Sequence, residues 1–269
     1  RPVVIGAYRA EGQKKGKSVI FQGHIDVVSP EPVSLWEHDP WGAEIVDNKM
    51  YGRGTADMKS GVTAMIFAVK AVRDAGIKLS SDVIVKTVLE EECTGNGTLA
   101  AIEEGFQADA ALIPEPVLGQ KALTAQVGVI WVRIKVKGLG AHTEKADKAV
   151  NAILESYKIT NALLDYERQL NRKKHEDFTN HPHPYNINIG KIQSGDWPSS
   201  VPSECTIDAR VGFPPGINPQ DVKDDLKAYL LAAAAKDEWL KENPPEITFY
   251  GFHAEGFSIN PDQLLFEVL

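Results

Sequence analysis

The chain has 269 residues, of which 43% are hydrophobic and 25% are charged, a composition typical of a soluble globular protein. The formal net charge of −8 argues against binding to a nucleic-acid backbone, which draws on a basic surface. The two cysteines are too few for a disulfide framework, and no apolar run reaches the length of a membrane span, so we expect a cytoplasmic protein without membrane contact.

The first part of the chain alternates strand and helix signals. Short apolar or β-branched runs predict strands over 18–21, 83–89 and 108–113. Before the second of these strands, apolar residues recur at helical spacing at Val62, Met65, Ile66, Val69 and Val72, and Gly76 stands where a C-cap belongs. Strands that alternate with helices predict an α/β fold, with a mostly parallel sheet and helices on both faces.

From about residue 122 the pattern changes. The sequence predicts a long strand over 127–136, a helix around 150–157, strands over 185–192 and 204–211, a helix over 219–236 and a strand over 247–252. This β-α-β-β-α-β order is that of a ferredoxin-like domain. We therefore expect 1–122 to be the first part of one domain and 123–254 to be an inserted ferredoxin-like domain. Residues 255–269 would begin the return to the first domain, with a helix starting at Pro261.

Imidazole and carboxylate groups follow the predicted strands of the first part. His24 and Asp26 follow the first strand, Glu90 to Glu92 follow the second, and Glu115 follows the third, while Asp57 precedes the helix. In open α/β sheets, ligands bind at the carboxyl ends of the strands. One histidine and several carboxylates without cysteine suit a hydrolytic zinc site, with one or two metals.

Each of these motifs has a plainer interpretation when it is taken alone. His24 and Asp26 could be a chance pair in a surface turn, although their spacing lets Asp26 accept a hydrogen bond from the imidazole and orient it. Asp57 could be only a helix N-cap, and Glu90 to Glu92 a solvated charge run. Glu115, between two prolines, could be a simple loop carboxylate.

Taken together and in order, the motifs resemble one family closely. They are Gly23-His24-Ile25-Asp26, Tyr51-Gly-Arg-Gly-Thr-Ala-Asp57-Met-Lys-Ser-Gly61, Glu90-Glu91-Glu92 and Pro114-Glu115-Pro116. Over nearly its whole length the chain is similar to the zinc amidohydrolase family of acetylornithine deacetylase, succinyl-diaminopimelate desuccinylase, aminoacylase and carboxypeptidase G. The resemblance implies a zinc-peptidase-like catalytic domain with an inserted lid and dimerisation domain.

The resemblance also implies a dinuclear metal site. Two Zn²⁺ ions would be bound per full-length subunit, with Co²⁺ or Mn²⁺ as possible replacements. His24 and Glu115 would bind one ion and Glu92 the other, and Asp57 would bridge the two.

The resemblance also implies roles for two further residues of this region. Asp26 would orient His24, and Glu91 would be the general base for the metal-bridging water. Glu90 replaces a family Asp that is not a ligand. Relatives hold the peptide bond after the bridging aspartate in cis, so we expect a cis bond between Asp57 and Met58.

The second part of the chain carries family motifs as well. Gly140-Ala-His142 resembles the lid motif whose His reaches the active site of the partner subunit and stabilises the oxyanion; the alternative is an exposed loop His. Arg210 would bind the substrate carboxylate, although Ser199 and Ser200 stand where many relatives carry Asn and the spacing to the preceding proline is shorter. The resemblance implies a homodimer that pairs through the lid.

The resemblance implies hydrolysis of a linear amide bond, with a small N-acyl amino acid or a short peptide as substrate. The sequence leaves open a di- or aminopeptidase of the same fold and, in another class, a non-catalytic dimerisation or binding module. Relatives complete the Glu92 metal site with a downstream histidine, and His253, the last histidine here, is a poor candidate. We expect these residues to be a fragment lacking both ends of the catalytic domain, inactive alone and holding at most one zinc firmly.

Overall fold

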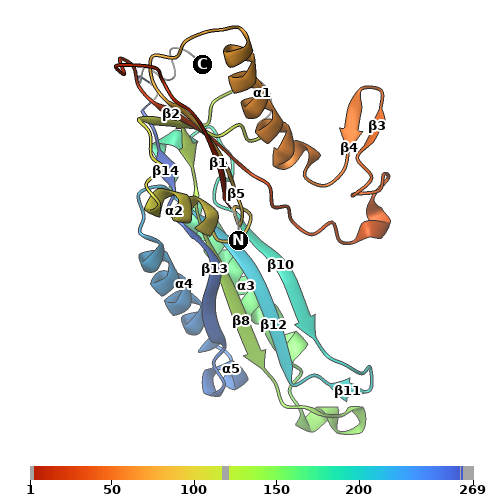
Figure 1. Ribbon diagram of the computed structural model, residues 1–269. Coiled ribbons are helices and arrows are strands. Elements are labelled where there is room, and N and C mark those ends of the chain that lie inside the picture. Colours follow the sequence, from red (N-terminus) through yellow and green to blue (C-terminus); the bar gives the residue numbers. More distant parts are fainter. Residues whose placement is uncertain (1–2, 117–120, 261, 263–269) are drawn as a thin grey trace. The chain divides into compact units, whose positions relative to one another are not determined.

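A computed structural model describes residues 3–116, 121–260 and 262 of the chain (Figure 1). The chain divides into two compact units, with the boundary between Ala122 and Leu123. No helix in this described part is long and apolar enough to cross a bilayer.

The first unit is built on a four-stranded sheet in the order β1-β5-β2-β6. The strands are β1 (Val4–Tyr8), β2 (Val19–His24), β5 (Val83–Val88) and β6 (Ala110–Leu112). β2 runs parallel to β5 and to β6, whereas β1 pairs antiparallel with β5 at the edge. The predicted α/β sheet with parallel strands is confirmed, and the carboxyl ends of β2, β5 and β6 point the same way.

Helices and a hairpin occupy the connections of this sheet. They are α1 (Gly61–Asp74), α2 (Asn96–Glu103), a short helical turn (Val33–Leu35) and the hairpin strands β3 (Glu44–Val46) and β4 (Lys49–Tyr51). An irregular helical segment (Thr55–Ser60) precedes α1 and contains Asp57. The Asp57–Met58 peptide bond is cis, as expected from the resemblance.

Hydrogen bonds to Asp82 hold the connection between β1 and β2 against the start of β5. Its carboxylate accepts hydrogen bonds from Lys14 Nζ (2.7 Å), from Arg9 Nη1 (2.5 Å) and from the Ala10 amide (3.0 Å). The ammonium of Lys14, then the guanidinium of Arg9 and the Ala10 N–H, hold the pKa of Asp82 far below its usual range.

The second unit is built on a four-stranded antiparallel sheet in the order β10-β12-β8-β13. Its elements in chain order are β8 (Gly128–Lys137), α3 (Ala152–Leu170), β10 (Ile187–Ser194), β12 (Glu204–Phe213), α4 (Pro219–Ala234) and β13 (Glu246–Ala254). Helices α3 and α4 pack on one face of this sheet (Figure 1). The β-α-β-β-α-β order matches the predicted ferredoxin-like arrangement.

The core of the second unit lies between that face and the two helices. Alternate residues of β8 and β12 are buried there, from Ile130 to Val136 and from Cys205 to Val211, because side chains along a strand alternate between faces. On the helices, Leu163 and Leu226 are fully buried. The other face of the sheet carries the polar and charged residues of the same strands.

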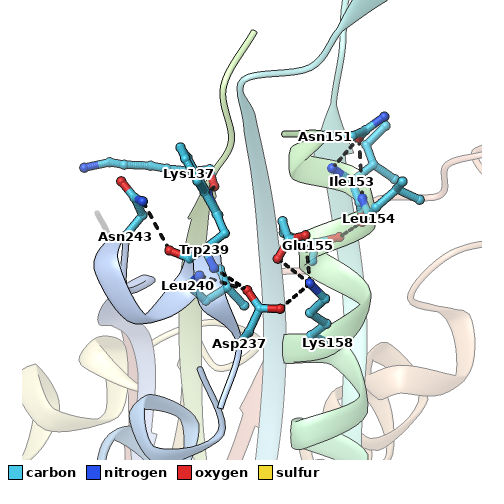
Figure 2. A network of polar contacts seen from close by, with 11 residues as sticks. Lys137, Asn151, Ile153, Leu154, Glu155, Lys158, Asp237, Trp239, Leu240 and Asn243 are labelled. Carbon is cyan, nitrogen blue, oxygen red and sulfur yellow. Dashed lines mark hydrogen bonds and ion pairs between the residues drawn. The ribbon is translucent and has the colours of Figure 1, made fainter. Parts of the chain in front are cut away.

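Side-chain caps begin the helices of the second unit. Asn151 Oδ1 accepts from the Ile153 and Leu154 amides at the start of α3, and Asn218 caps α4. Asp237 caps a short extra helix, α5 (Glu238–Glu242), and binds Lys158 of α3 (Figure 2). α5 lies outside the predicted elements.

Shorter strands complete the second unit. β9 (Ala141–His142) pairs with β11 (Ser200–Val201), and β7 (Ala125–Gln126) pairs with β14 (Phe257–Ser258). β14 therefore belongs to this unit, whereas the sequence placed 255–269 in the return to the first domain. A two-residue strand has no pattern of its own, which explains the difference. Pro261 and 263–269 lie outside the described residues.

Candidate metal centre

His24 is the last residue of β2 and its side chain is only 1% exposed. Its Nδ1 donates a hydrogen bond to the backbone carbonyl of Asp26 (2.9 Å), which leaves Nε2 as the ring nitrogen that can bind a metal once it is deprotonated. Nε2 lies 3.0 Å from Asp57 Oδ1 and 3.7 Å from Glu115 Oε1. The ring is thus oriented with the nitrogen that can bind a metal facing two carboxylates.

Asp26 contacts His24 differently from the sequence-based expectation. The hydrogen bond comes from the Asp26 carbonyl, while Oδ1 of its carboxylate is 3.6 Å from Nδ1. The other carboxylate oxygen accepts the backbone N–H of Glu92 (3.2 Å). Asp26 therefore ties the segment after β2 to the segment after β5, and its orienting role remains a prediction.

The segment that carries Asp57 is held close to the segment that carries Glu115. A Cβ at Gly61 would lie 2.0 Å from the carbonyl oxygen of Pro114, so only glycine permits this approach of α1 to the end of β6. The approach brings Asp57 and Glu115 to the same nitrogen of His24.

Glu90, Glu91 and Glu92 follow β5 and have different surroundings. Glu90 has a positive φ of 66°, and its carboxylate accepts hydrogen bonds from Thr94 Oγ1 (2.8 Å) and Asn96 Nδ2 (3.3 Å), which organises the turn. Burial raises the pKa of Glu91 and of Glu92, and nearby carboxylates add to the effect. The sequence did not indicate Thr94 or Asn96, because a contact within a turn has no periodic signal.

The acidic groups of the site crowd one another. Burial raises the pKa of Glu115 to about 7; the charge of His24 opposes this shift, while those of Asp57, Glu91 and Glu92 add to it. For His24, burial lowers the pKa, but the hydrogen bonds to Asp26 and Asp57 and the neighbouring carboxylates outweigh it, so the pKa is raised. The region carries more negative charge than its cations balance, and a bound divalent cation would offset the repulsion.

The donors fit a divalent metal. One ligand atom from each of His24, Asp57 and Glu92 lies within 4.8 Å of the other two, a grouping that the described residues contain once. Ligands at about 2.0–2.2 Å from one zinc ion are separated by at most about 4.4 Å, so small adjustments would close the site. One buried oxygen of Asp26 has no hydrogen-bond partner among the described residues.

Two predicted site residues lie in the second unit. His142 ends β9, is 67% exposed, and its Nδ1 accepts the Glu144 amide (3.3 Å). Arg210 lies on β12, where burial lowers the pKa of its guanidinium. The geometry thus brings together His24, Asp26, Asp57, Glu91, Glu92 and Glu115 in the first unit, while His142 and Arg210 lie on β9 and β12 of the second.

The chain is similar in sequence to known proteins. The chain is 29% identical over 261 residues to N-formyl-4-amino-5-aminomethyl-2-methylpyrimidine deformylase of Bacillus subtilis, covering 93% of this chain and 60% of that protein. It is 30% identical over 262 residues to acetylornithine deacetylase of Pectobacterium atrosepticum, covering 96% and 65%. The chain thus spans about three fifths to two thirds of the length of these relatives.

The fold is also that of solved structures. An M20 family metallo-carboxypeptidase from Sulfolobus solfataricus superimposes with a TM-score of 0.76 at 18% identity, covering 99% of this chain and 70% of that one. The model of peptidase family M20/M25/M40 matches residues 20–257, from within β2 to the first residue of β14. The chain is therefore a member of peptidase family M20/M25/M40.

Proposed function

We propose that the protein is a metal-dependent hydrolase of linear amide bonds that removes the acyl group from N-acyl amino acids. The observation that carries the proposal is the convergence of His24, Asp57 and Glu92 around a possible metal position. Similarity to a deformylase and a deacetylase, both named for removal of an acyl group, supports it. These residues follow the carboxyl ends of parallel strands, where open α/β sheets bind small ligands.

His24 Nε2, Asp57, Glu92 and Glu115 would hold the metal. Their nitrogen and oxygen donors suit Zn²⁺, with Co²⁺ or Mn²⁺ as alternatives, and Asp57 is the proposed bridge in a two-metal site. A metal bound there supplies Lewis-acid chemistry, polarising the amide carbonyl and lowering the pKa of a water molecule to about 7.

Glu91 is the proposed general base. It accepts a proton from the attacking water and delivers it to the leaving nitrogen, so one carboxylate serves both halves of the reaction. The pKa of Glu91 is raised, mainly by burial, which makes its carboxylate a better proton acceptor than a solvated one. Asp26 keeps the imidazole of His24 oriented through the contact to Nδ1.

The second unit is the proposed lid and dimerisation domain of a homodimer. β10 is an edge strand of its sheet and Ile192 on it is 48% exposed; on α3, Leu154 and Tyr157 are 57% and 54% exposed. Unpaired strand edges and exposed apolar side chains are features that a partner can cover. In such a dimer His142 would stabilise the oxyanion in the partner subunit's site, and Arg210 would bind the substrate carboxylate.

A reducing, cytoplasmic setting is part of the proposal. Cys93 and Cys205 are both free in the structure, and Cys205 is buried in the core of the second unit. Neither cysteine forms a disulfide bond, which is typical of proteins in a reducing compartment.

A substrate screen tests the function. The full-length protein, loaded in turn with zinc, cobalt and manganese, is assayed against N-acetyl and N-succinyl amino acids and against dipeptides. We expect deacylation to exceed dipeptide cleavage, and Glu91→Gln to lose at least about a hundredfold in kcat while keeping its metal. The matched control is Glu104→Gln, an exposed glutamate of the same unit.

Faster dipeptide cleavage would replace the deacylase proposal with a peptidase of the same fold. Near wild-type turnover by Glu91→Gln would refute the role given to Glu91, and absence of any amide hydrolysis would favour a binding module.

A further inference from the structure

A pocket of about 340 Å³ lies in the first unit, between the connection that follows β2 and the end of the β3–β4 hairpin. One wall is formed by residues 30–32 and 35–38, and the other by residues 51–53. None of the expected metal ligands is among these lining residues. The pocket is therefore a candidate ligand site of its own, built within one unit.

The walls of this pocket are largely apolar and aromatic. The ring of Tyr51 stacks on the ring of His38, with centroids 4.0 Å apart, and Nδ1 of His38 lies 2.7 Å from the Glu44 carboxylate. On the other wall, the indole N–H of Trp36 donates a hydrogen bond to the carbonyl oxygen of Pro30 (2.7 Å). These contacts hold the rings in place, so that they offer flat apolar surface to a planar ligand.

Arg53 adds a cation with unused hydrogen-bond donors to these walls. Its guanidinium carbon lies 5.0 Å from the centroid of the Trp36 ring. Among the described residues, only Nη2 of this guanidinium has a partner, the carbonyl oxygen of Ser29 at 3.4 Å, and Nε is buried without one. A guanidinium whose face stacks on a ring keeps its edge donors, which suit a carboxylate. An anion in the pocket would therefore supply an acceptor that the protein lacks there.

The backbone on both sides of Arg53 holds this side chain at the pocket. The amide of Arg53 donates to the carbonyl oxygen of Pro40 (2.8 Å), and a Cβ at Gly52 would lie 3.1 Å from the same oxygen. A Cβ at Gly54 would lie 2.6 Å from Cγ1 of Val27. The two glycines thus permit close packing around Arg53, which fixes where its side chain starts.

Glu31 and Glu37 also line the pocket, and their charge opposes that of Arg53. Both glutamates are exposed, and a carboxylate oxygen of Glu31 accepts the backbone N–H of Val33 (3.2 Å). Arg53 is partly buried. Because water screens exposed charges more than buried ones, the positive charge dominates inside the pocket.

We propose that this pocket binds a small aromatic carboxylate. Arg53 donates hydrogen bonds to the carboxylate, and the ring of the ligand packs against the aromatic side chains of the walls. The proposal goes beyond amide hydrolysis, because it involves none of the expected metal ligands.

Titration calorimetry on the full-length, zinc-loaded protein tests the proposal with three probes. Benzoate carries a ring and a carboxylate, acetate carries the carboxylate alone, and benzylamine carries the ring with the opposite charge. We expect benzoate to bind at least about tenfold more tightly than acetate, because its ring buries apolar surface. Benzylamine should not bind, because Arg53 repels it.

Variants separate this pocket from the metal centre, which could bind a carboxylate as well. Arg53→Gln should weaken benzoate binding at least about tenfold, whereas His24→Ala should leave it unchanged. Leu35→Asp places a negative charge on the pocket wall and should also weaken binding; Leu35 is 80% exposed, so the fold should tolerate the change. The matched control is Ser34→Asp, which adds the same charge to the same turn at an exposed residue that does not line the pocket.

Benzylamine binding as tight as that of benzoate would overturn the proposal, and so would unchanged benzoate binding in Arg53→Gln and Leu35→Asp. Benzoate binding that is lost only in His24→Ala would belong to the metal centre and would equally refute the pocket. Circular dichroism checks that each variant is folded. If Arg53→Gln is not, the comparison of Leu35→Asp with Ser34→Asp decides, since equal affinities in these two variants would contradict binding beside Leu35.

Discussion

The network that joins α3 to α5 provides a sharp test of how the second unit is stabilised (Figure 2). Asp237 Oδ1 accepts from the amides of Trp239 (3.0 Å) and Leu240 (2.9 Å), which caps α5, while Oδ2 accepts from Lys158 Nζ (2.5 Å). Lys158 also binds both carboxylate oxygens of Glu155 at 2.8 Å. Replacing Asp237 by Asn keeps a capping oxygen and removes the charge, whereas Ala removes both.

The two contributions have different expected sizes. Loss of an N-cap costs about 0.5–2 kcal/mol of unfolding free energy. The side chain of Lys158 is 47% exposed and that of Asp237 22%, so their ion pair contributes only about 0.2–1 kcal/mol. We expect Asp237→Asn to cost about 0.5 kcal/mol and Asp237→Ala about 1.5 kcal/mol. Lys158→Met should cost about 1–3 kcal/mol, because it leaves Glu155, with an 11% exposed side chain, without this ammonium.

Urea denaturation followed by far-ultraviolet circular dichroism measures these differences, and acid provides an internal check. The hydrogen bond from Lys158, followed by the backbone amides of α5, lowers the pKa of Asp237 in the folded state. A lowered folded pKa means that the stabilisation is present above the unfolded pKa of about 3.9 and is lost as the pH falls through the folded value. The gap between wild type and Asp237→Asn should therefore shrink below about pH 4. Equal costs for Asn and Ala, or a gap that persists in acid, would refute the reasoning.

Three further outcomes follow from the geometry. Gly61→Ala should destabilise the first unit by about 1–3 kcal/mol in urea denaturation and weaken metal binding, while Gly6→Ala, where nothing lies within 4 Å of the added Cβ, should do neither. Asp82→Asn should lower the urea midpoint at neutral pH, with a difference that declines below about pH 4, because the native contacts depress the pKa of this carboxyl. Mixing inactive His142→Ala and Glu91→Gln full-length subunits should restore part of the activity; hybrids as inactive as their parents would exclude a role for His142 in the partner subunit.

Many of the strands and helices could be predicted from local patterns in the sequence. The apolar runs over 18–21 and 83–89 became β2 and β5, and the helical repeat from Val62 to Val72 lies within α1. One or both faces of these elements are buried, so apolar residues recur in their sequences with the spacing of a strand or a helix. The carboxyl ends of β2 and β5 then placed His24 and the glutamates at one edge.

The missed elements are short. α2 and α5 span Asn96–Glu103 and Glu238–Glu242, too few residues for a helical period to stand out. The hairpin of β3 and β4 did carry a signal, because Asp47 and Asn48 at its turn have φ values of 49° and 62°, a conformation that Asp and Asn tolerate.

Contacts between distant segments could not be read from the sequence at all. The carbonyl of Asp26 on His24 and its carboxylate on the Glu92 amide depend on where two loops meet. The position of Arg210 opposite Trp131 depends on strand register, and a register shift of one residue would move every side chain of the strand to the other face. The sequence motifs therefore indicated His24, Asp57 and Glu92, which the structure brings close together, while the contacts around them required the structure.

The central claim is that His24 belongs to a metal centre that hydrolyses amides. Metal content and N-acyl amino acid hydrolysis, measured together on the full-length wild type, His24→Ala and the control His38→Ala, test it most directly. His38 is also in the first unit but binds Glu44 and stacks on Tyr51. We predict that His24→Ala loses bound metal and hydrolysis together while His38→Ala keeps both. Full metal content and activity in His24→Ala would contradict the account.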